Sequence, residues 1–413
     1  MSMTVITARL FQVQEIYRSS TLLVRKIAGV DTSRWVITFD RLRNETGFDR
    51  DGFAEDFLKA QGISAIHVLG CGNDWYQYPD MAKAVAAIGV ATQGAVRRIT
   101  YGSSMGGYAA IRLADAVGAA AALALSPQYS NDPARVPWED RWQAHGRRIA
   151  WLPWLEGPIG GAATTIIAYD PHDADGHHAA LIAAETVCVP IPIAHCGHPA
   201  GMFLAEVHLL RPLLEAVLAD TLDPSALIRD IRARRRLSAN YLGTLAARQP
   251  TIRQQTAIAI TRLALLQNPG LSLSKLVLAQ LLTRAGQHGE ALKLHAEMVD
   301  ECNRAPPHLI PYADALMASG AVGDAILIAR EVVQQLPDEA HLRHWLASML
   351  WRDRACSDAI AAQRRAVALD PGVALYADAL RRYRRRALGR RLGGGIAAGR
   401  ALIGRITSRR RGG

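Results

Sequence analysis

The chain has 413 residues, of which 50% are hydrophobic and 21% are charged. This length predicts two or three folded domains, and the composition excludes a fibrous or globally disordered protein. The net charge of +11 arises at one end, because residues 381–413 hold twelve arginines and no acidic residue, which leaves −1 for the first 380 residues. The charge therefore does not indicate a nucleic-acid-binding fold, and nucleic acid is not an expected partner.

The first half of the chain alternates β-rich runs with helical stretches, after an opening of about 34 residues that fits an antiparallel hairpin. Such alternation predicts a parallel sheet that is covered on both faces and binds ligands at the carboxyl ends of its strands. We therefore expect an α/β domain over residues 1–222. The predicted strands are 35–39, 63–69, 98–101, 121–125, 164–169 and 187–193. The predicted helices are 53–60, 81–88, 108–117, 177–185 and 202–218.

A Gly-x-Ser-x-Gly motif, Gly102-Ser-Ser104-Met-Gly106, lies between the third predicted strand and the helix at 108–117. In this setting the turn forces the central serine into a strained conformation with its hydroxyl exposed, and the glycines relieve the tight bend. The N-terminus of the following helix offers N–H groups to a developing oxyanion. Ser104 is therefore the candidate nucleophile.

With this motif between a strand and a helix, residues 30–220 resemble the α/β-hydrolase family. The resemblance implies a mostly parallel sheet and a triad in the chain order serine, acid, histidine. It also implies that His198, just beyond the last predicted strand, is the general base. His195 is nearby but lies closer to the strand end, so His198 is preferred.

The same resemblance places the acid in the loop after the predicted strand 164–169, which offers three aspartates. Asp173 stands four residues after the strand end, the usual position in this family, and is the first choice. Asp170 is the second choice, because it could instead hold the loop or contact the histidine. Asp175 is the third choice, because it is better suited to capping the next helix.

The resemblance also implies an oxyanion site made of backbone N–H groups. One donor is the N–H of Met105, the residue after the nucleophile. The second is expected in the loop after the predicted strand 35–39, from Arg41 or Leu42. The lipase-type His-Gly-Gly-Gly motif is absent from this loop, which argues against a standard lipase.

Residues 127–163 lie where this family commonly inserts a cap, and they contain four of the eight tryptophans. Trp138 and Trp142 from this segment, with Trp75 after the second predicted strand, are predicted to line a substrate pocket. The alternative is that these aromatic residues only pack the cap against the sheet.

A metal site is the alternative interpretation of the acid-bearing loop, where histidines and aspartates crowd together between residues 169 and 178. Metal ligands must converge on one point, whereas His177 and His178 are adjacent at a helix start and point in different directions. We therefore expect an ordinary polar loop, with neither a metal nor a cofactor.

Helical patterns dominate after residue 223, and alanines recur there every 34 residues, three of them followed by a proline twelve residues later. This spacing resembles the tetratricopeptide repeat (TPR) over residues 238–373, with an irregular helical bundle as the alternative. We expect an all-α TPR-like solenoid at 223–375, whose groove recruits a protein or peptide partner. The positions are Ala257, Ala291, Ala325 and Ala359, with Pro269, Pro337 and Pro371.

Residues 376–413 are predicted to form an arginine-rich tail, which is either a solvated end or a contact for an anionic membrane surface. Apolar runs are shorter than the roughly 20 residues of a membrane span, and the opening residues lack the pattern of a secretory signal. Five cysteines without metal-type spacing indicate reduced thiols. We expect a cytoplasmic protein, peripheral to the inner face of the membrane if the tail binds lipid.

These features favour a serine hydrolase of the esterase or thioesterase type, which acts on a small acyl ester or an acylated carbohydrate through an acyl-Ser104 intermediate. One alternative is an acyltransferase that uses a carbohydrate hydroxyl as the acceptor. The other is a non-catalytic interaction protein, in which the TPR-like repeats bind a partner and the hydrolase-like domain is degenerate.

Overall fold

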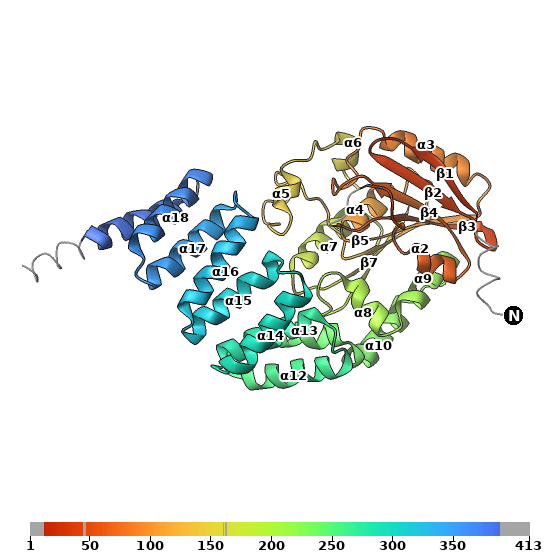
Figure 1. Cartoon of the computed structure of the whole chain (residues 1–413). Helices are drawn as coiled ribbons and strands as arrows, with labels where there is room; N and C mark the ends of the chain where they lie inside the picture. The colour runs from red at the N-terminus through yellow and green to blue at the C-terminus, as the bar shows by residue number, and fades with distance from the viewer. Residues whose placement is uncertain (1–11, 44–46, 160, 162, 389–413) are drawn as a thin grey trace, which may run out of the picture. The chain divides into compact units, whose positions relative to one another are not determined.

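The computed structural model describes residues 12–43, 47–159, 161 and 163–388. The described residues form two compact units. One extends to Arg248 and includes Leu263–Pro269; the other comprises Gln249–Arg262 and the residues from Gly270 onward. The first unit contains a mostly parallel sheet and the second is helical, so the predicted fold class is confirmed (Figure 1).

The sheet of the first unit has eight strands in the order β1-β2-β4-β3-β5-β6-β7-β8. The hairpin β1–β2 and the pair β2–β4 are antiparallel, and all other pairs are parallel. The opening hairpin is therefore confirmed. The strands are β1 (Val13–Arg18), β2 (Leu22–Ile27), β3 (Asp31–Phe39), β4 (Ile63–Gly70), β5 (Arg97–Ser103), β6 (Ala121–Leu125), β7 (Thr164–Tyr169) and β8 (Cys188–Pro192).

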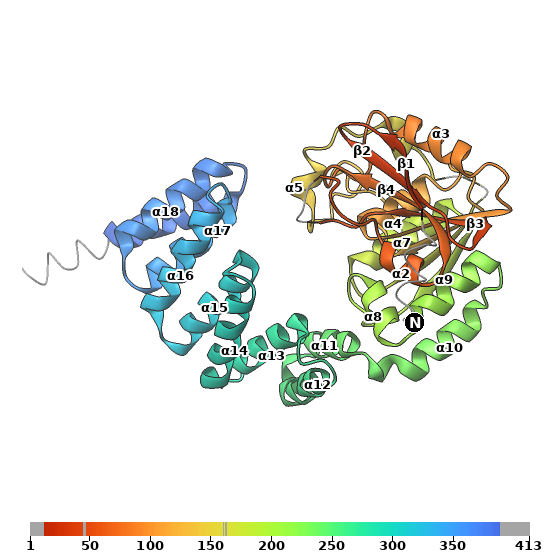
Figure 2. The same ribbon diagram turned by 45° about the vertical axis from the view of Figure 1, so that its right-hand side comes forward.

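Helices cover both faces of this sheet (Figure 2). Alternate side chains of the central strand β5 meet different segments: the Thr100 hydroxyl donates to the Ala110 carbonyl of α4, while the Tyr101 ring centroid lies 5.0 Å from that of Phe53, which precedes α2. Strands buried on both faces need apolar residues at every position, as in β6. The helices of this unit are α2 (Glu55–Ala60), α3 (Met81–Ala91), α4 (Met105–Arg112), α5 (Gln143–Gly146), α6 (Pro153–Glu156), α7 (Ala174–Glu185), α8 (Ala200–Glu206), α9 (Leu210–Ala219), α10 (Pro224–Arg234) and α11 (Ala239–Ala247).

Most predicted elements differ from the observed ones by a few residues at their ends, and one predicted helix and one domain boundary differ more. The single helix predicted at 202–218 is two helices, α8 and α9, because His208 adopts a left-handed conformation (φ 56°) that a helix cannot continue through. The compact unit also runs past the predicted boundary at 222. The Asn240 side chain of α11 donates to the Cys196 carbonyl, which fastens this helix to the loop after β8.

The second unit consists of antiparallel helix pairs with the predicted 34-residue spacing. The four repeating alanines are fully buried, since small side chains allow the helices to approach closely. Gly286 and Gly320 end helices with φ of 75° and 90°, a conformation that favours glycine. The helices of this part of the chain are α12 (Gln254–Gln267), which belongs to the second unit as far as Arg262, and α13 (Ser272–Arg284), α14 (His288–Glu301), α15 (Pro306–Ser319), α16 (Val322–Gln335), α17 (Ala340–Arg352) and α18 (Cys356–Leu369). Residues 374–388 are also helical, and the rest of the predicted basic tail lies outside the described residues.

Ion pairs connect neighbouring repeats at regular spacing along the surface of the second unit. At least one side chain of each pair is exposed to solvent, so each pair contributes little to stability. The packing of one repeat on the next therefore depends mainly on the buried small residues. The pairs are Arg262–Glu290, Lys275–Glu301, Arg304–Glu331 and Arg330–Asp358. Across the part of the chain that the structure describes, no helix is sufficiently long and apolar to span a membrane.

Candidate active site

Ser104 lies at the turn between β5 and α4, at the carboxyl edge of the sheet. Its backbone has φ 55° and ψ −119°, a strained conformation for a residue with a side chain. The Ser104 N–H donates to the Leu125 carbonyl at 2.9 Å, which ties the turn to the neighbouring strand β6. Ser104 is 6% exposed, so its hydroxyl is largely withdrawn from solvent, whereas the motif predicts an exposed hydroxyl.

The two motif glycines are required by close backbone contacts around this turn. A Cβ atom on Gly102 would lie 2.1 Å from the Gly106 carbonyl oxygen. A Cβ atom on Gly106 would lie 2.2 Å from the Phe39 carbonyl oxygen at the end of β3. Neither space accepts a side chain, so the motif brings β3, β5 and α4 together at the serine.

His198, in the loop between β8 and α8, connects Ser104 to a buried carboxylate. The His198 Nε2 atom is 2.9 Å from the Ser104 Oγ atom. The His198 Nδ1 atom is 2.8 Å from Oδ2 and 3.1 Å from Oδ1 of Asp175. Serine, imidazole and carboxylate therefore form a continuous hydrogen-bonded chain, with the residues in the chain order serine, aspartate, histidine.

Asp175 is fully buried, yet its charge is well supported. Burial raises the pKa of Asp175, but the hydrogen bond and charge of His198, together with the charge of Arg141, outweigh it and hold the pKa below its ordinary value. The carboxylate therefore stays ionised and faces the Nδ1–H of the histidine.

The first-choice acid, Asp173, does not contact His198, so the structure contradicts this ranking. Helix α7 begins at Ala174 rather than at residue 177, and Asp173 is its N-cap: the carboxylate accepts the Asp175 N–H at 2.9 Å. Asp173 therefore has the N-cap role predicted for Asp175, and Asp175 makes the contact with His198 predicted for Asp173. The reason is that the earlier start of α7 places Asp175 in the first turn of the helix, where its side chain faces His198.

Asp170, the second choice, is also buried and also makes no contact with His198 that the structure records. Its carboxylate accepts the Gly197 N–H at 2.8 Å and the Arg248 Nη1–H at 2.8 Å. Asp170 therefore fastens the acid loop to the histidine loop. His195, the alternative histidine, stacks on His172 with ring centroids 5.0 Å apart.

The predicted oxyanion residues lie on both sides of the serine turn. Met105 is the first residue of α4, and the contact of Gly106 with the end of β3 brings the loop that carries Arg41 and Leu42 beside this helix start. The backbone N–H of Asp40, which comes first in that loop, already donates to the Tyr76 hydroxyl. The N–H groups of Arg41 and Leu42 therefore stay the predicted second donors.

The cap segment reaches this site through an arginine that no sequence motif marks. The Arg141 Nη1 atom is 2.9 Å from the Asp175 Oδ1 atom, and the Arg141 side chain is 26% exposed. Its other guanidinium edge contacts Glu139, with Nη2 2.6 Å from Oε2. The guanidinium also lies 4.3 Å from the centroid of the Trp142 ring. Arg141 therefore links the cap to the candidate acid.

Of the three predicted pocket tryptophans, Trp142 faces the candidate histidine, His198. The Trp142 ring centroid is 5.2 Å from that of His198. Trp75 is fully buried behind it, with the two indole centroids 6.3 Å apart. Trp138 is 39% exposed and packs on His178 of α7, at 4.6 Å between centroids. Trp138 therefore packs the cap onto a helix, as the alternative interpretation had it.

Glu139 is buried between Arg141 and His178, whose Nε2 atom is 2.9 Å from Glu139 Oε2. Burial raises the pKa of Glu139, but the bonds from His178 and Arg141 lower it further, to about 2 from an ordinary 4.5. A lowered folded-state pKa stabilises the protein above pH 4.5, and this contribution is lost as the pH falls toward 2.

We expect Glu139→Gln to reduce the free energy of unfolding at pH 7 by about 2 kcal/mol. The difference from the wild type should shrink as the pH falls below 4.5, where the wild-type carboxylate begins to lose its advantage. Thermal unfolding between pH 3 and pH 8 measures both effects. Glu215→Gln is the matched control, because Glu215 forms an exposed pair with Arg211 that should contribute little at any pH. A difference that does not change with pH would contradict this account.

The residues of the alternative metal site do not converge. His172 stacks on His195, Asp173 caps α7, Asp175 binds His198, and the two adjacent histidines separate, with only His178 fully buried. Within residues 12–388, apart from the short gaps in the description, no group of three histidine, cysteine or acidic side chains could hold a metal ion.

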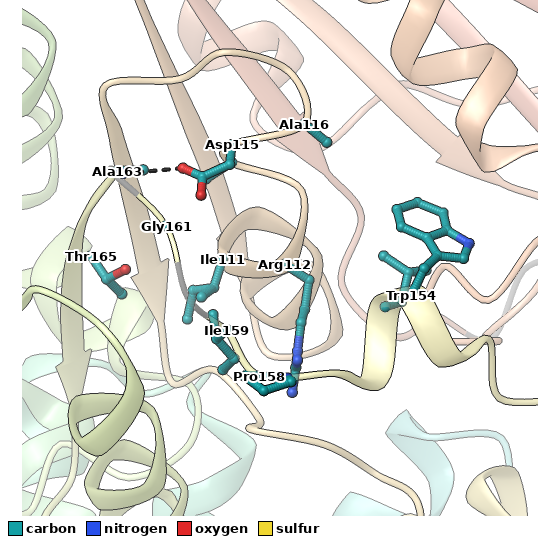
Figure 3. A pocket seen from close by; sticks show the side chains of 12 residues that line it. Ile111, Arg112, Asp115, Ala116, Trp154, Pro158, Ile159, Gly161, Ala163 and Thr165 are labelled. Carbon is teal, nitrogen blue, oxygen red and sulfur yellow. Dashed lines mark hydrogen bonds between the residues drawn. The ribbon is translucent and has the colours of Figure 1, made fainter.

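A cavity of about 210 Å³ lies elsewhere in the first unit (Figure 3). It is lined by Ile111 and Arg112 at the C-terminal end of α4, by Asp115 after that helix, and by residues near the start of β7, where Asp115 accepts the Ala163 N–H at 3.1 Å. Because α4 runs away from Ser104, this cavity is at the amino edge of the strands and is separate from the triad residues.

Comparisons with known proteins show no matching family profile and no matching curated protein. Among solved structures, the chain is similar to esterase 2 of Thermogutta terrifontis phosphonylated by sarin (15% identity, 52% of this chain and 96% of that one, TM-score 0.38). It is also similar to the capsule O-acetyltransferase of Neisseria meningitidis serogroup A (11% identity, 49% and 92%, TM-score 0.34). A third similar structure is a TPR protein of Thermus thermophilus (17% identity, 45% and 98%, TM-score 0.33). These scores are low, so the chemistry of the site is inferred from its own contacts.

Proposed function

We propose that the protein is a serine hydrolase that cleaves an acyl ester or thioester through an acyl-Ser104 intermediate. The observation that carries this proposal is the hydrogen-bonded chain from Ser104 through His198 to Asp175, built on a serine with φ 55° at a strand–turn–helix. Such a chain activates a hydroxyl that is a weak nucleophile on its own.

In the proposed reaction, the His198 Nε2 atom removes the Ser104 proton while Oγ attacks the acyl carbon. The proton then passes to the leaving alcohol or thiol as the acyl–oxygen or acyl–sulfur bond breaks. A water molecule then attacks the acyl-Ser104 intermediate in the same way, with His198 as the base, and the carboxylic acid is released as Ser104 regains its proton. Asp175 fixes the Nδ1–H tautomer and stabilises the imidazolium ion, and the N–H groups of Met105 and of Arg41 or Leu42 receive the negative oxygen.

Acyl transfer to a carbohydrate hydroxyl is a second candidate, because Trp142 places an aromatic face beside His198, where a sugar ring could stack. The acyl-enzyme is the same, and a sugar hydroxyl replaces water. Product analysis with and without an added sugar acceptor separates the two reactions.

The helical repeats are proposed to bind a protein or peptide partner, because stacked helix pairs form an extended concave surface. The basic tail is proposed to contact an anionic membrane surface from the cytoplasm. A non-catalytic role for the whole chain is the outcome to which a failed labelling experiment would point.

The proposed nucleophile is tested with a fluorophosphonate probe, which phosphonylates an activated serine as fluoride leaves. We expect one labelled peptide that contains Ser104, no labelling of Ser104→Ala, and labelling of His198→Ala slowed at least about 100-fold. Ser103→Ala is the matched control, because the adjacent Ser103 is equally buried and its hydroxyl has no hydrogen-bond partner. Absence of labelling in a folded wild type, or equal labelling of Ser104→Ala, would rule out the proposal.

A further inference from the structure

Gln128 makes a second hydrogen bond to the candidate nucleophile, which the triad does not explain. It follows β6, and the residue is 1% exposed. The Gln128 Nε2 atom is 3.1 Å from the Ser104 Oγ atom. The Gln128 Oε1 atom is buried and has no hydrogen-bond partner. A buried amide with one end on the reacting oxygen and the other end unsatisfied has a cost in stability, so it calls for a functional explanation.

The backbone around Gln128 is held firmly on both sides. The Ser126 N–H donates to the Ala168 carbonyl of β7 at 2.7 Å, and the Tyr129 N–H donates to the His178 Nδ1 atom at 3.1 Å. A Cβ atom on Gly107 of α4 would lie 3.1 Å from Pro127, so this loop also packs closely on the helix that follows the serine. The amide is therefore a fixed part of the site.

Hydrogen-bond directions around Ser104 are determined by its partners. An amide nitrogen only donates, so the Ser104 oxygen accepts from Gln128. The His198 Nδ1 atom faces the ionised Asp175 and carries the proton, which leaves Nε2 as an acceptor. The Ser104 hydroxyl proton therefore points to Nε2, the atom that removes it.

We propose that Gln128 is a further catalytic residue, which holds the Ser104 hydroxyl with its proton directed to His198. This inference rests on the proposed function of the same site. The opposite amide orientation would offer Oε1 as an acceptor and draw the proton away from the base. It would also leave both amide N–H groups unpaired, whereas the assigned orientation leaves one N–H and the carbonyl oxygen unpaired, and a buried unpaired N–H is the rarer of the two in folded proteins. No proton is transferred to or from the amide.

Two variants test this role through the rate constant of fluorophosphonate labelling, in which the Oγ–P bond forms, the P–F bond breaks and the serine proton passes to His198. Gln128→Met keeps the length of the side chain and removes its donor. We expect labelling about tenfold slower than in the wild type, the value of one lost hydrogen bond in the transition state. Its thermal stability should equal or exceed that of the wild type, because the unsatisfied Oε1 is also removed.

Gln128→Glu reverses the hydrogen bond, because an ionised carboxylate accepts the serine proton. Labelling at pH 8 should be at least about 100-fold slower than in the wild type. As the pH falls, the new carboxyl group regains a proton that it can donate to Ser104, so the labelling rate of Gln128→Glu divided by that of the wild type should rise. The other ionisable groups near this site are the same residues in both proteins, so the new carboxyl group is the one titratable group by which they differ. The shared groups are His198, Asp175, Arg141, Glu139 and His178.

The outcomes separate this inference from the function on which it rests. An unlabelled wild type would refute both. A labelled wild type with Gln128→Met at the same rate, or a Gln128→Glu ratio that is constant with pH, would overturn the role of Gln128 alone. Loss of labelling through unfolding is recognised because circular dichroism and thermal unfolding are measured on the same samples, and Gln128→Met is expected to be at least as stable as the wild type.

Discussion

Asp175→Asn is expected to slow fluorophosphonate labelling of Ser104 by about 10⁴-fold, the loss typical of a triad whose acid becomes an amide. The buried carboxylate accepts the His198 Nδ1–H at 2.8 Å. An asparagine has no charge to stabilise the imidazolium ion, and its NH₂ group can turn toward Nδ1 and favour the tautomer with the proton on Nε2. The serine would then face a donor where it needs a base.

Asp173→Asn is the matched control for this experiment. Both residues lie in the same loop, but Asp173 accepts the Asp175 N–H as the N-cap of α7, a role that asparagine fills equally well. We expect its labelling rate to stay within about threefold of the wild type, because a side chain that does not touch His198 changes the barrier by under about 1 kcal/mol. A large loss in Asp173→Asn with a small loss in Asp175→Asn would restore the first choice made from sequence.

This exchange of roles shows where prediction from sequence ends. The sequence pointed to Ser104, His198 and the loop after β7, because the strand–turn–helix motif and the spacing of β-rich runs are local patterns. The structure brings the serine, the histidine and an aspartate of that loop into hydrogen-bond contact. The choice of acid depended on where α7 begins, and a helix start is uncertain by a few residues from sequence. A shift of three residues, from 177 to 174, was enough to exchange the N-cap and the triad contact.

Contacts between distant segments explain the residues that were missed. Gln128, Glu139 and Arg141 are ordinary polar residues in a segment without a motif. Only the folded chain brings Gln128 to Ser104, Arg141 to Asp175 and Glu139 to His178. The 34-residue repeat was easier to predict, because a small buried residue returns at the same position of every repeat. A periodic pattern in the sequence is therefore sufficient to predict the helical repeats. The candidate active site is assembled from several loops, and the sequence of any one loop does not show which side chains of the others it will contact.

Gly106→Ala is expected to destabilise the first unit by at least about 3 kcal/mol and to abolish labelling of Ser104. The new methyl group would lie 2.2 Å from the Phe39 carbonyl oxygen and 2.8 Å from the Asp40 carbonyl oxygen. Both are backbone atoms, so no side-chain rotation relieves the overlap. The helix α4 would have to move away from β3, and the Met105 N–H would move with it.

Gly89→Ala is the matched control, because Gly89 is exposed within α3 and a Cβ atom there meets nothing within 4 Å. The same added methyl group should stabilise the protein by about 0.4–1 kcal/mol, since alanine restricts the unfolded chain and favours the helix. Thermal unfolding and labelling are measured on both variants. If Gly106→Ala unfolded at the wild-type temperature and was labelled at the wild-type rate, then the close approach of β3 to α4 would not be what positions Ser104. If Gly106→Ala lowers the unfolding temperature while Gly89→Ala raises it, then glycine is required at position 106 because of the close approach of Gly106 to the Phe39 carbonyl oxygen.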